Sequence, residues 1–387
     1  MNKKNVASLP LTLYGIGCGV SQSLMSLGGT LFAVIGAGSL NQVRNSRLKK
    51  SVRTAILLSW SWILFSTLNL LAHGWNERTS HTLGNIPLLW VPLSGFLLPG
   101  ILSPSRRQFE GILKVTGLAI LVSATFASFE FFSSGNPATA FLRNPIYLAY
   151  NLLPAAIFFC EMFLDETFLS IQIRRLCGLI AIAAALGIFC TVSRMPMTCL
   201  LFYAAFRIMP LWRKKTDSRG ATLALLLAVG FSVSLYRLVP AFQEKVARAF
   251  SPTDPSRVWR EIAWKHNWNL FLNSPIAGLG AERNGIDVAK MPEFQGHWQP
   301  NHLYFAHSIY FQMLADSGVI GTTLFLGFWI SLALSCPTLV PLLAIVALSG
   351  LTENIFNNSK AAHAVFFYTL MTIIAYRLKE GSSDDAT

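Results

Sequence analysis

Long blocks of apolar residues constrain this chain more than any other feature of its sequence. A helix needs roughly 20 mostly apolar residues to cross the hydrocarbon core of a bilayer, and block after block of the chain approaches that length. Hydrophobic residues make up 53% of the chain and charged residues only 13%, whereas soluble domains carry roughly 25% charged residues. The sequence therefore predicts an all-α integral membrane protein.

The apolar blocks predict about twelve transmembrane helices, each near the length that a bilayer requires. Serines and glycines interrupt the apolar stretch 8–40, and we interpret it as a tight hairpin of two helices. The blocks lie near 8–22, 24–40, 54–73, 85–103, 109–132, 147–164, 177–193, 196–212, 221–240, 319–335, 338–351 and 362–376.

This pattern divides the chain into four segments. Residues 1–240 hold the first nine expected spans, 241–318 form one large polar loop, 319–376 hold the last three spans, and 377–387 form a tail. Within the loop, Asp254-Pro255 predicts the start of a helix, with an aspartate cap and a proline at the first position. Asn273-Ser274-Pro275 predicts where that helix ends.

The lysines and arginines indicate the orientation of the spans. They gather in alternate short loops, which the positive-inside rule places in the cytoplasm. Both termini then lie in the cytoplasm and the loop 241–318 faces the periplasm, as expected for the inner membrane of a bacterium. The basic set comprises Arg44, Arg47, Lys49, Lys50, Arg53, Arg106, Arg107, Arg174, Arg175, Arg213, Lys214, Lys215, Arg219, Arg377 and Lys379.

The formal net charge of +13 could suggest a nucleic-acid partner, but the distribution of the charges argues against one. The basic residues lie in short loops beside apolar blocks, where anionic lipid headgroups attract them. We therefore expect membrane lipids as partners, and no nucleic acid.

No metal or cofactor site is expected from the cysteines and histidines. The six cysteines lie in or against apolar blocks, where a thiol behaves as a small hydrophobic group. His297, His302 and His307 are five residues apart, which would place successive side chains about 140° apart on a helix. That spacing builds no three-ligand face, and the sequence contains no HExxH motif.

The predicted periplasmic side is instead rich in arginine. Arg194 ends an apolar block in TVSRMPM, where a charge needs a cavity, a partner or a lipid phosphate. GLGAERNG at 278–285 reads as a flexible loop that presents Arg283, with Glu282 either orienting an arginine or simply solvated. Guanidinium groups suit phosphate and pyrophosphate, so this side favours a pyrophosphate leaving group. The set is Arg143, Arg194, Arg248, Arg257, Arg260 and Arg283.

His307 differs from the other loop histidines because it directly precedes an apolar run, SIYFQMLADSGVIG. It would stand at the mouth of the helix bundle, where a histidine can act as a general base near neutral pH.

Three motifs, in this order, resemble the O-antigen ligase family, which shares a superfamily with the O-antigen polymerases. They are TVSR at 191–194, NSPIAGLG at 273–280, and HSIYFQMLADSGVIG at 307–321, in which a glycine follows the histidine by eleven residues. The resemblance covers roughly 140–335. It departs at Ser308, where the family often has Asn, and at Asp316, where it often has Glu.

The resemblance implies a GT-C-like membrane glycosyltransferase that inverts the anomeric centre and uses neither metal nor cofactor. The donor would be a glycan on undecaprenyl diphosphate and the acceptor a sugar of lipid A–core, joined at the periplasmic face. His307 would deprotonate or orient the acceptor hydroxyl, and Arg194 and Arg283 would hold the diphosphate. The residues expected to bind substrate are Arg143, Arg257, Arg260, Glu282 and His302.

Two other functions fit parts of this pattern. A polymerase would use a similar donor and extend another lipid-linked glycan, with the same need for a base and a diphosphate clamp. A transporter or flippase of lipid-linked glycan would place polar groups near the bilayer midplane, often in repeated halves. The candidate residues gather on one side and the sequence shows no repeat, so we favour the enzyme. The strongly basic helix predicted in the periplasmic loop suits a phosphorylated acceptor, so we favour the ligase over the polymerase.

Overall fold

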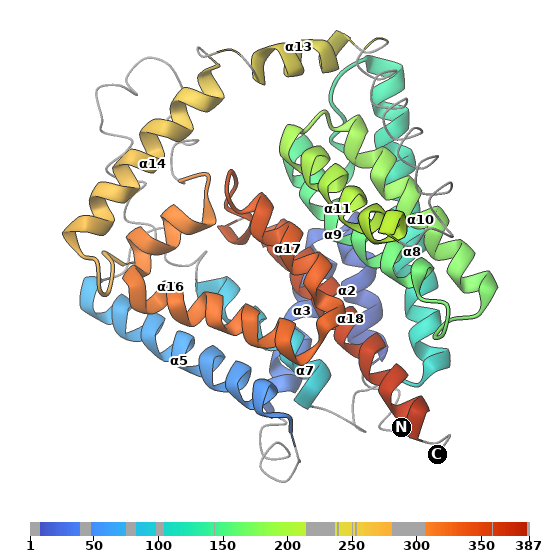
Figure 1. Ribbon diagram of the computed structural model, residues 1–387, viewed down its shortest axis with the longest axis horizontal. Helices are drawn as coiled ribbons and strands as arrows, with labels where there is room; N and C mark the ends of the chain where they lie inside the picture. The colour runs from blue at the N-terminus through green and yellow to red at the C-terminus, as the bar shows by residue number, and fades with distance from the viewer. Residues whose placement is uncertain are drawn as a thin grey trace.

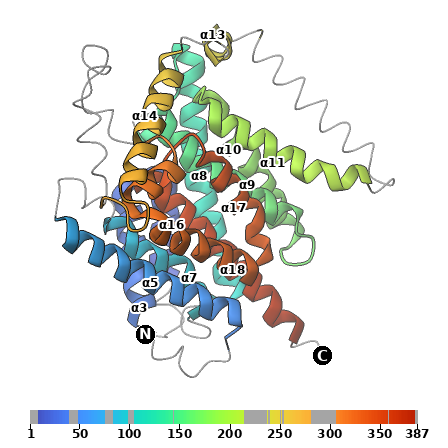
Figure 2. The same ribbon diagram turned by 60° about the vertical axis from the view of Figure 1, so that its left-hand side comes forward.

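The computed structural model is all-helical in the part of the chain that it describes (Figures 1 and 2). That part comprises residues 8–38, 48–74, 83–97, 104–142, 144–213, 237, 240–249, 251, 254–280, 306–357 and 359–384. No strand occurs within these ranges, which confirms the predicted all-α class.

Six described helices are long and apolar enough to cross a membrane, so the chain has the character of a multi-pass membrane protein. They are α5 (Lys50–His73), α8 (Arg106–Ser134), α9 (Pro145–Leu164), α10 (Ile171–Cys190), α16 (Ile309–Ser335) and most of α18 (Ser359–Asp384). Shorter apolar helices are α2 (Ser8–Val20), α3 (Gln22–Gly38), η1 (Ile86–Leu89) with α7 (Trp90–Leu97), and η5 (Pro337–Leu339) with α17 (Val340–Ser349).

The remaining described helices are shorter or more polar. They are η2 (Ala140–Leu142), α11 (Arg194–Arg213), α13 (Pro240–Ala249), α14 (Pro255–Asn273) and η6 (Ile355–Asn357). The expected span at 221–240 lies almost entirely outside the described residues, so the full number of spans stays a prediction.

The predicted hairpin in 8–40 is confirmed by the packing of α2 on α3. A Cβ atom added at Gly17 would lie 2.2 Å from the backbone nitrogen of Met25, and one added at Gly28 would lie 2.6 Å from Tyr14. An added Cβ at either position would overlap the neighbouring helix, so only glycine fits. Small residues are what lets the backbones of membrane helices approach so closely. The glycines that interrupt the apolar stretch therefore allow the two helices to pack closely.

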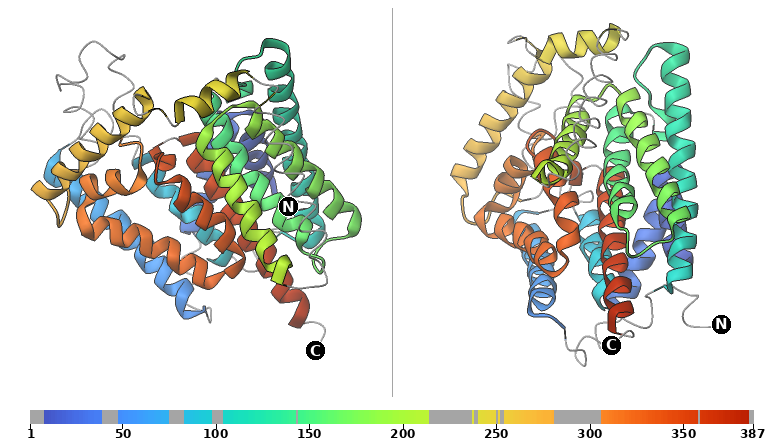
Figure 3. Two further views of the ribbon diagram at one scale, coloured as in Figure 1. Left: turned by 45° about the horizontal axis from the view of Figure 1, so that its top comes forward. Right: turned by 45° about the vertical axis from the view of Figure 1, so that its right-hand side comes forward.

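Basic residues from separate loops of the predicted cytoplasmic set meet at one end of the bundle. Their contacts with acidic partners are Lys49–Glu380 at 2.9 Å, Lys379–Asp165 at 3.0 Å and Arg174–Glu166 at 3.3 Å. Exposed pairs of this kind add little stability, but they show that the start of α5 and the ends of α9 and α18 lie together. α13 and α14 lie at the opposite end (Figures 1 and 3).

α14 begins and ends where the sequence predicted. Asp254 is its N-cap residue, Pro255 is its first residue, and Ser274 is its C-cap. The capping role expected for the Asp254 side chain is wrong, because the carboxylate makes no hydrogen bond to the first turn. It pairs with Arg194 instead.

α16 is broken at Gly318, whose φ of 58° and ψ of −164° are not helical. The break frees the backbone N–H groups that follow it, and a buried N–H needs a partner. Val319 donates to the carbonyl of Pro275 at 2.8 Å, and Ile320 donates to that of Ile276 at 3.2 Å. The turn after α14 therefore replaces the helical acceptors that the break removes.

The same turn is held by hydrogen bonds in the opposite direction. Leu279 donates its N–H to Ala315 at 2.9 Å, and Gly280 donates to Asp316 at 3.0 Å. Gly278 has a φ of 74°, and a Cβ there would lie 2.3 Å from the backbone of Asp316. The motifs NSPIAGLG and HSIYFQMLADSGVIG are thus one interlocked unit, which explains their glycines.

Gly318→Ala should lower the thermal unfolding midpoint of the purified protein by several degrees. Its backbone conformation costs a non-glycine residue about 1–3 kcal/mol, and the added Cβ would lie 2.4 Å from the backbone of Ile276. The matched control is Gly111→Ala in α8, where a Cβ meets nothing within 4 Å. An unchanged midpoint for Gly318→Ala would contradict the interlocked arrangement.

Candidate active site

His307 lies directly before α16 in a strained backbone conformation. Its φ is 50°, which is uncommon for a residue other than glycine and is often found at functional sites. Ser308 is extended and buried as the N-cap of α16, and the N–H of Ile309 donates to the carbonyl of Gly350 at 2.9 Å. The start of α16 is therefore tied to the end of α17, and this holds the imidazole in place.

Glu353 is the partner of His307. Nδ1 of the imidazole lies 3.2 Å from Oε1 of the carboxylate, and the two side chains are 35% and 20% exposed. An ionised carboxylate can only accept a hydrogen bond, so Nδ1 carries the proton and donates. Nε2 is then the nitrogen that is left to act as an acceptor, which is the tautomer that a general base requires.

Burial alone would raise the pKa of Glu353, but its neighbours reverse the effect. The hydrogen bond from His307 and its electrostatic attraction, the positive charge of Arg260, and the N–H of Asn354 together lower the pKa of Glu353 below its ordinary value. Glu353 is therefore ionised at neutral pH, where it fixes the orientation of the imidazole.

Glu353 is not among the site residues predicted from the sequence. It is the one acidic residue between Asp316 and Glu380, a stretch that otherwise reads as apolar helices and short turns. An isolated carboxylate in such a stretch is costly unless it is paired or functional, and this was the available signal.

Arg260 ties α14 to the segment that carries Glu353. Its Nε donates to the carbonyl of Thr352 at 3.2 Å, and Nη1 donates to Oγ of Ser256 at 2.7 Å. The structure thus brings Arg260 into the His307 site. Arg257 is exposed and pairs with Glu261 along the same helix at 2.7 Å. This ion pair does not connect Arg257 to His307.

Arg194 forms an ion pair with Asp254. Nη2 lies 2.9 Å from Oδ2, and the arginine side chain remains 32% exposed while the aspartate is 7% exposed. The TVSR motif makes the preceding turn: Thr191 donates its hydroxyl to Ile188 at 2.7 Å and accepts the N–H of Ser193 at 3.2 Å. The hydroxyl residues of this motif therefore end α10 and aim the arginine that begins α11.

The first two turns of α14 join the Arg194 and His307 sites. Asp254 and Arg260 are six residues apart, which corresponds to about 9 Å along a helix. Asp254 holds Arg194, and Arg260 holds the backbone beside Glu353. One short segment thus connects a guanidinium from α11 to the His307–Glu353 pair.

Lys360 is a further cation at this end of the bundle. Its Nζ donates to the carbonyl of Leu142 at 3.2 Å and lies 5.5 Å from the centre of the Tyr147 ring. Its contact places the start of α18 beside the residue that precedes Arg143.

Four predicted site residues lie outside the described part of the chain, and their roles stay predictions: Arg143, Glu282, Arg283 and His302. Within that part, no group of three or more His, Cys, Asp and Glu side chains could hold a metal ion. The six cysteines are free thiols, five of them buried and Cys160 partly so.

The two departures from the family pattern take part in the local structure. Ser308 is buried at the N-cap position of α16, and Asp316 accepts a hydrogen bond from Nε2 of Gln312 at 2.8 Å. Both are therefore positioned by the same helix start that positions His307.

This geometry can be compared with known proteins. Residues 179–326 match the O-antigen ligase family. The matched stretch contains all three motifs and His307, and it confirms the resemblance found in the sequence. A search of the curated proteins gives no match to this chain.

The O-antigen ligase match supports a membrane enzyme of the glycosyltransferase type, in the group that ligases and polymerases share. Glu353 and Lys360 lie beyond the matched stretch, so their place in the site comes from the structure alone.

Replacing Glu353 by Gln should change how stability depends on pH. Because folding lowers the pKa of Glu353, the unfolded chain binds the proton more readily, and the stabilisation by the carboxylate is lost as pH falls below the ordinary value of 4.5. The unfolding midpoint of the wild type should exceed that of Glu353→Gln at pH 7, and the difference should shrink toward pH 3.

The control for this titration is Glu261→Gln, which removes a carboxylate that is 56% exposed. A difference between Glu353→Gln and the wild type that stays constant from pH 7 to pH 3 would show that no ionised pair exists at His307.

Proposed function

We propose that this protein is an inverting glycosyltransferase that transfers O-antigen polysaccharide from undecaprenyl diphosphate to lipid A–core. The observation that carries the proposal is the His307–Glu353 pair, which lies at the same end of the bundle as Arg194 and Arg260. This arrangement combines a general base with cations that suit a diphosphate.

In the proposed reaction, the oxygen of an acceptor hydroxyl forms a bond to the anomeric carbon of the donor. The bond from that carbon to the diphosphate oxygen breaks, and its electron pair leaves with the diphosphate. The hydroxyl proton passes to Nε2 of His307, because Nδ1 is engaged by Glu353. Attack opposite the leaving group inverts the anomeric configuration.

Arg194 and Arg283 would stabilise the charge that develops on the diphosphate. Hydrogen-bond donors aimed at a developing charge commonly lower the activation free energy by several kcal/mol. Arg194 suits this role because Asp254 engages one of its nitrogens, while the side chain remains partly exposed. A guanidinium carries five N–H donors in a fixed fork, so an arginine oriented by a carboxylate can still bind phosphate oxygens.

The other predicted residues would position the site or contact the substrate. Arg260 acts mainly by holding α14 against Thr352 and by its charge beside Glu353. Arg143, Arg257, Glu282 and His302 remain proposed contacts to substrate.

We further propose a GT-C-like architecture of about twelve spans in the bacterial inner membrane, with no metal in the reaction. The segregation of charged groups supports this topology. The contacts of Lys49, Arg174 and Lys379 lie at one end of the bundle, and the His307 site lies at the other. Both termini would be cytoplasmic and the site periplasmic.

Expression of the gene in a ligase-deleted strain should restore long-chain lipopolysaccharide, seen as a ladder on a gel. His307→Ala should abolish the ladder, because loss of a general base commonly lowers a rate about 10²–10⁴-fold. Arg194→Lys should lose most of it, since a lost charge-stabilising donor commonly lowers a rate about 10²–10³-fold.

The control in that strain is Arg53→Gln, which removes an exposed positive charge at the other end of the bundle and should leave the ladder intact at equal expression. If the wild type fails there and restores chain growth in a polymerase-deleted strain, the acceptor is a second lipid-linked glycan and the ligase proposal is wrong.

A further inference from the structure

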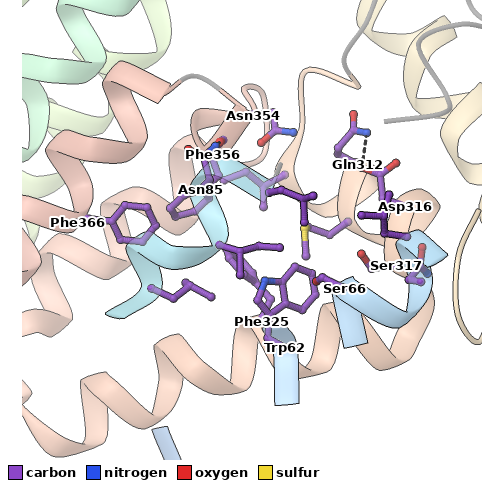
Figure 4. A pocket seen from close by; sticks show the side chains of 17 residues that line it. Trp62, Ser66, Asn85, Gln312, Asp316, Ser317, Phe325, Asn354, Phe356 and Phe366 are labelled. Carbon is purple, nitrogen blue, oxygen red and sulfur yellow. Dashed lines mark hydrogen bonds between the residues drawn. The ribbon is translucent and has the colours of Figure 1, made fainter. Parts of the chain in front are cut away.

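A pocket opens next to the residues that follow His307 and Glu353 in the chain (Figure 4). Its open volume is about 820 Å³, which includes solvent at the mouth. Ile309 and Asn354 line it and are close neighbours in sequence of His307 and Glu353. The other walls come from the last turns of α5, from the segment before α7, and from α16, η6 and α18.

The pocket has an apolar floor and a polar rim without a lysine or arginine among its described residues. Trp62 and Phe325 lie below the opening, with ring centres 5.7 Å apart, and Phe356 and Phe366 close one side (Figure 4). The polar lining residues are Ser66, Asn69, Asn85, Gln312, Asp316, Ser317 and Asn354.

The charge of the lining argues against a phosphate group. Among the described residues that line the pocket there is no lysine or arginine, and Asp316 contributes a carboxylate. A diphosphate needs cationic donors, and these come instead from α11 and α14. The pocket therefore suits a neutral part of the substrate.

The amides of the rim are held in fixed orientations by the backbone. Asn69 donates its Nδ2 to the carbonyl of Ala277 at 2.6 Å, and Asn85 donates its Nδ2 to that of Phe356. In the described part of the chain, neither Oδ1 atom accepts a hydrogen bond. Fixed acceptors of this kind are the polar groups that give a small-molecule pocket its orientation and specificity.

The two serines add donors to these acceptors. Within the described residues, the hydroxyls of Ser66 and Ser317 make no hydrogen bond, although both side chains line the pocket. A purely apolar occupant such as an isoprenoid chain would bury these groups without a hydrogen-bond partner, which is unfavourable. An occupant with hydroxyl groups around an apolar face would satisfy both the rim and the floor.

We infer that this pocket binds one neutral sugar ring of the glycan substrate, next to the bond that reacts at His307. The C–H face of the ring packs on Trp62 and Phe325, and its hydroxyls meet the serines and amides. This inference rests on the proposed function for the identity of the reaction. The ring belongs either to the donor glycan or to the acceptor core, and the test separates these sources.

Filling the pocket should impair sugar binding without impairing the fold. Ser66→Leu places a larger apolar side chain in the pocket, and Ser61→Leu makes the same change at an exposed position of α5. With purified protein, Ser66→Leu should raise the KM for one glycan substrate about tenfold at a similar unfolding midpoint, whereas Ser61→Leu should not. A rise confined to the donor assigns the ring to the donor, and a rise confined to the acceptor assigns it to the core.

A second experiment measures occupancy of the pocket directly, does not depend on enzyme activity, and needs only a conservative substitution. In Ser66→Cys, the rate of alkylation by N-ethylmaleimide, corrected for the wild-type background, should fall when lipid-free O-antigen oligosaccharide or core oligosaccharide is added. Protection by undecaprenyl phosphate alone would show a lipid site and overturn the inference, as would unchanged KM values together with no protection by either sugar.

The two experiments separate this inference from the proposed function. Protection by an oligosaccharide in a protein that transfers no glycan would keep the pocket and overturn the function. Transfer to lipid A–core with no protection and unchanged KM values would keep the function and overturn the pocket.

Discussion

The structure depends on a break in a membrane helix whose backbone is satisfied by another segment. An unpaired N–H group is costly at the depth of the bilayer, so an interrupted helix survives only where protein supplies the missing partners. At Gly318 the turn 274–280 supplies them, and it receives hydrogen bonds from the same helix in return. Because His307 begins that helix and α14 leads into that turn, this exchange fixes the two elements that build the site.

Charge pairing then determines what the site can do. Two charged side chains at this end of the bundle have partners from distant segments: Arg194 pairs with Asp254, and His307 pairs with Glu353. Arg260 joins the two pairs through α14. A charge at a membrane boundary is tolerated when it is paired in this way. The outcome is an imidazole with a defined tautomer and a guanidinium with donors still available. The neighbouring pocket carries no lysine or arginine among its described lining residues.

The sequence predicted elements well because their signals are local. The apolar blocks, the glycines of 8–40 and the Asp254-Pro255 start depend on neighbouring residues, and the described helices follow them closely. His307 also had a local signal, as a polar residue before an apolar run. The pairings of His307 with Glu353 and of Arg194 with Asp254 had no local signal, because they join residues 46 and 60 positions apart in the chain. Asp254 shows how far local signals reach. Its position at the start of α14 was predicted correctly, but its carboxylate pairs with Arg194, which is distant in the sequence.

The most direct test of the account is the choice of acceptor by the purified protein. The enzyme would receive a glycan on undecaprenyl diphosphate together with equal amounts of lipid A–core and a second lipid-linked glycan, and the products would be analysed by mass spectrometry and NMR. The account predicts glycan on lipid A–core, with the anomeric configuration inverted and undecaprenyl diphosphate released. Growth of the lipid-linked glycan alone, or retention of the configuration, would contradict it.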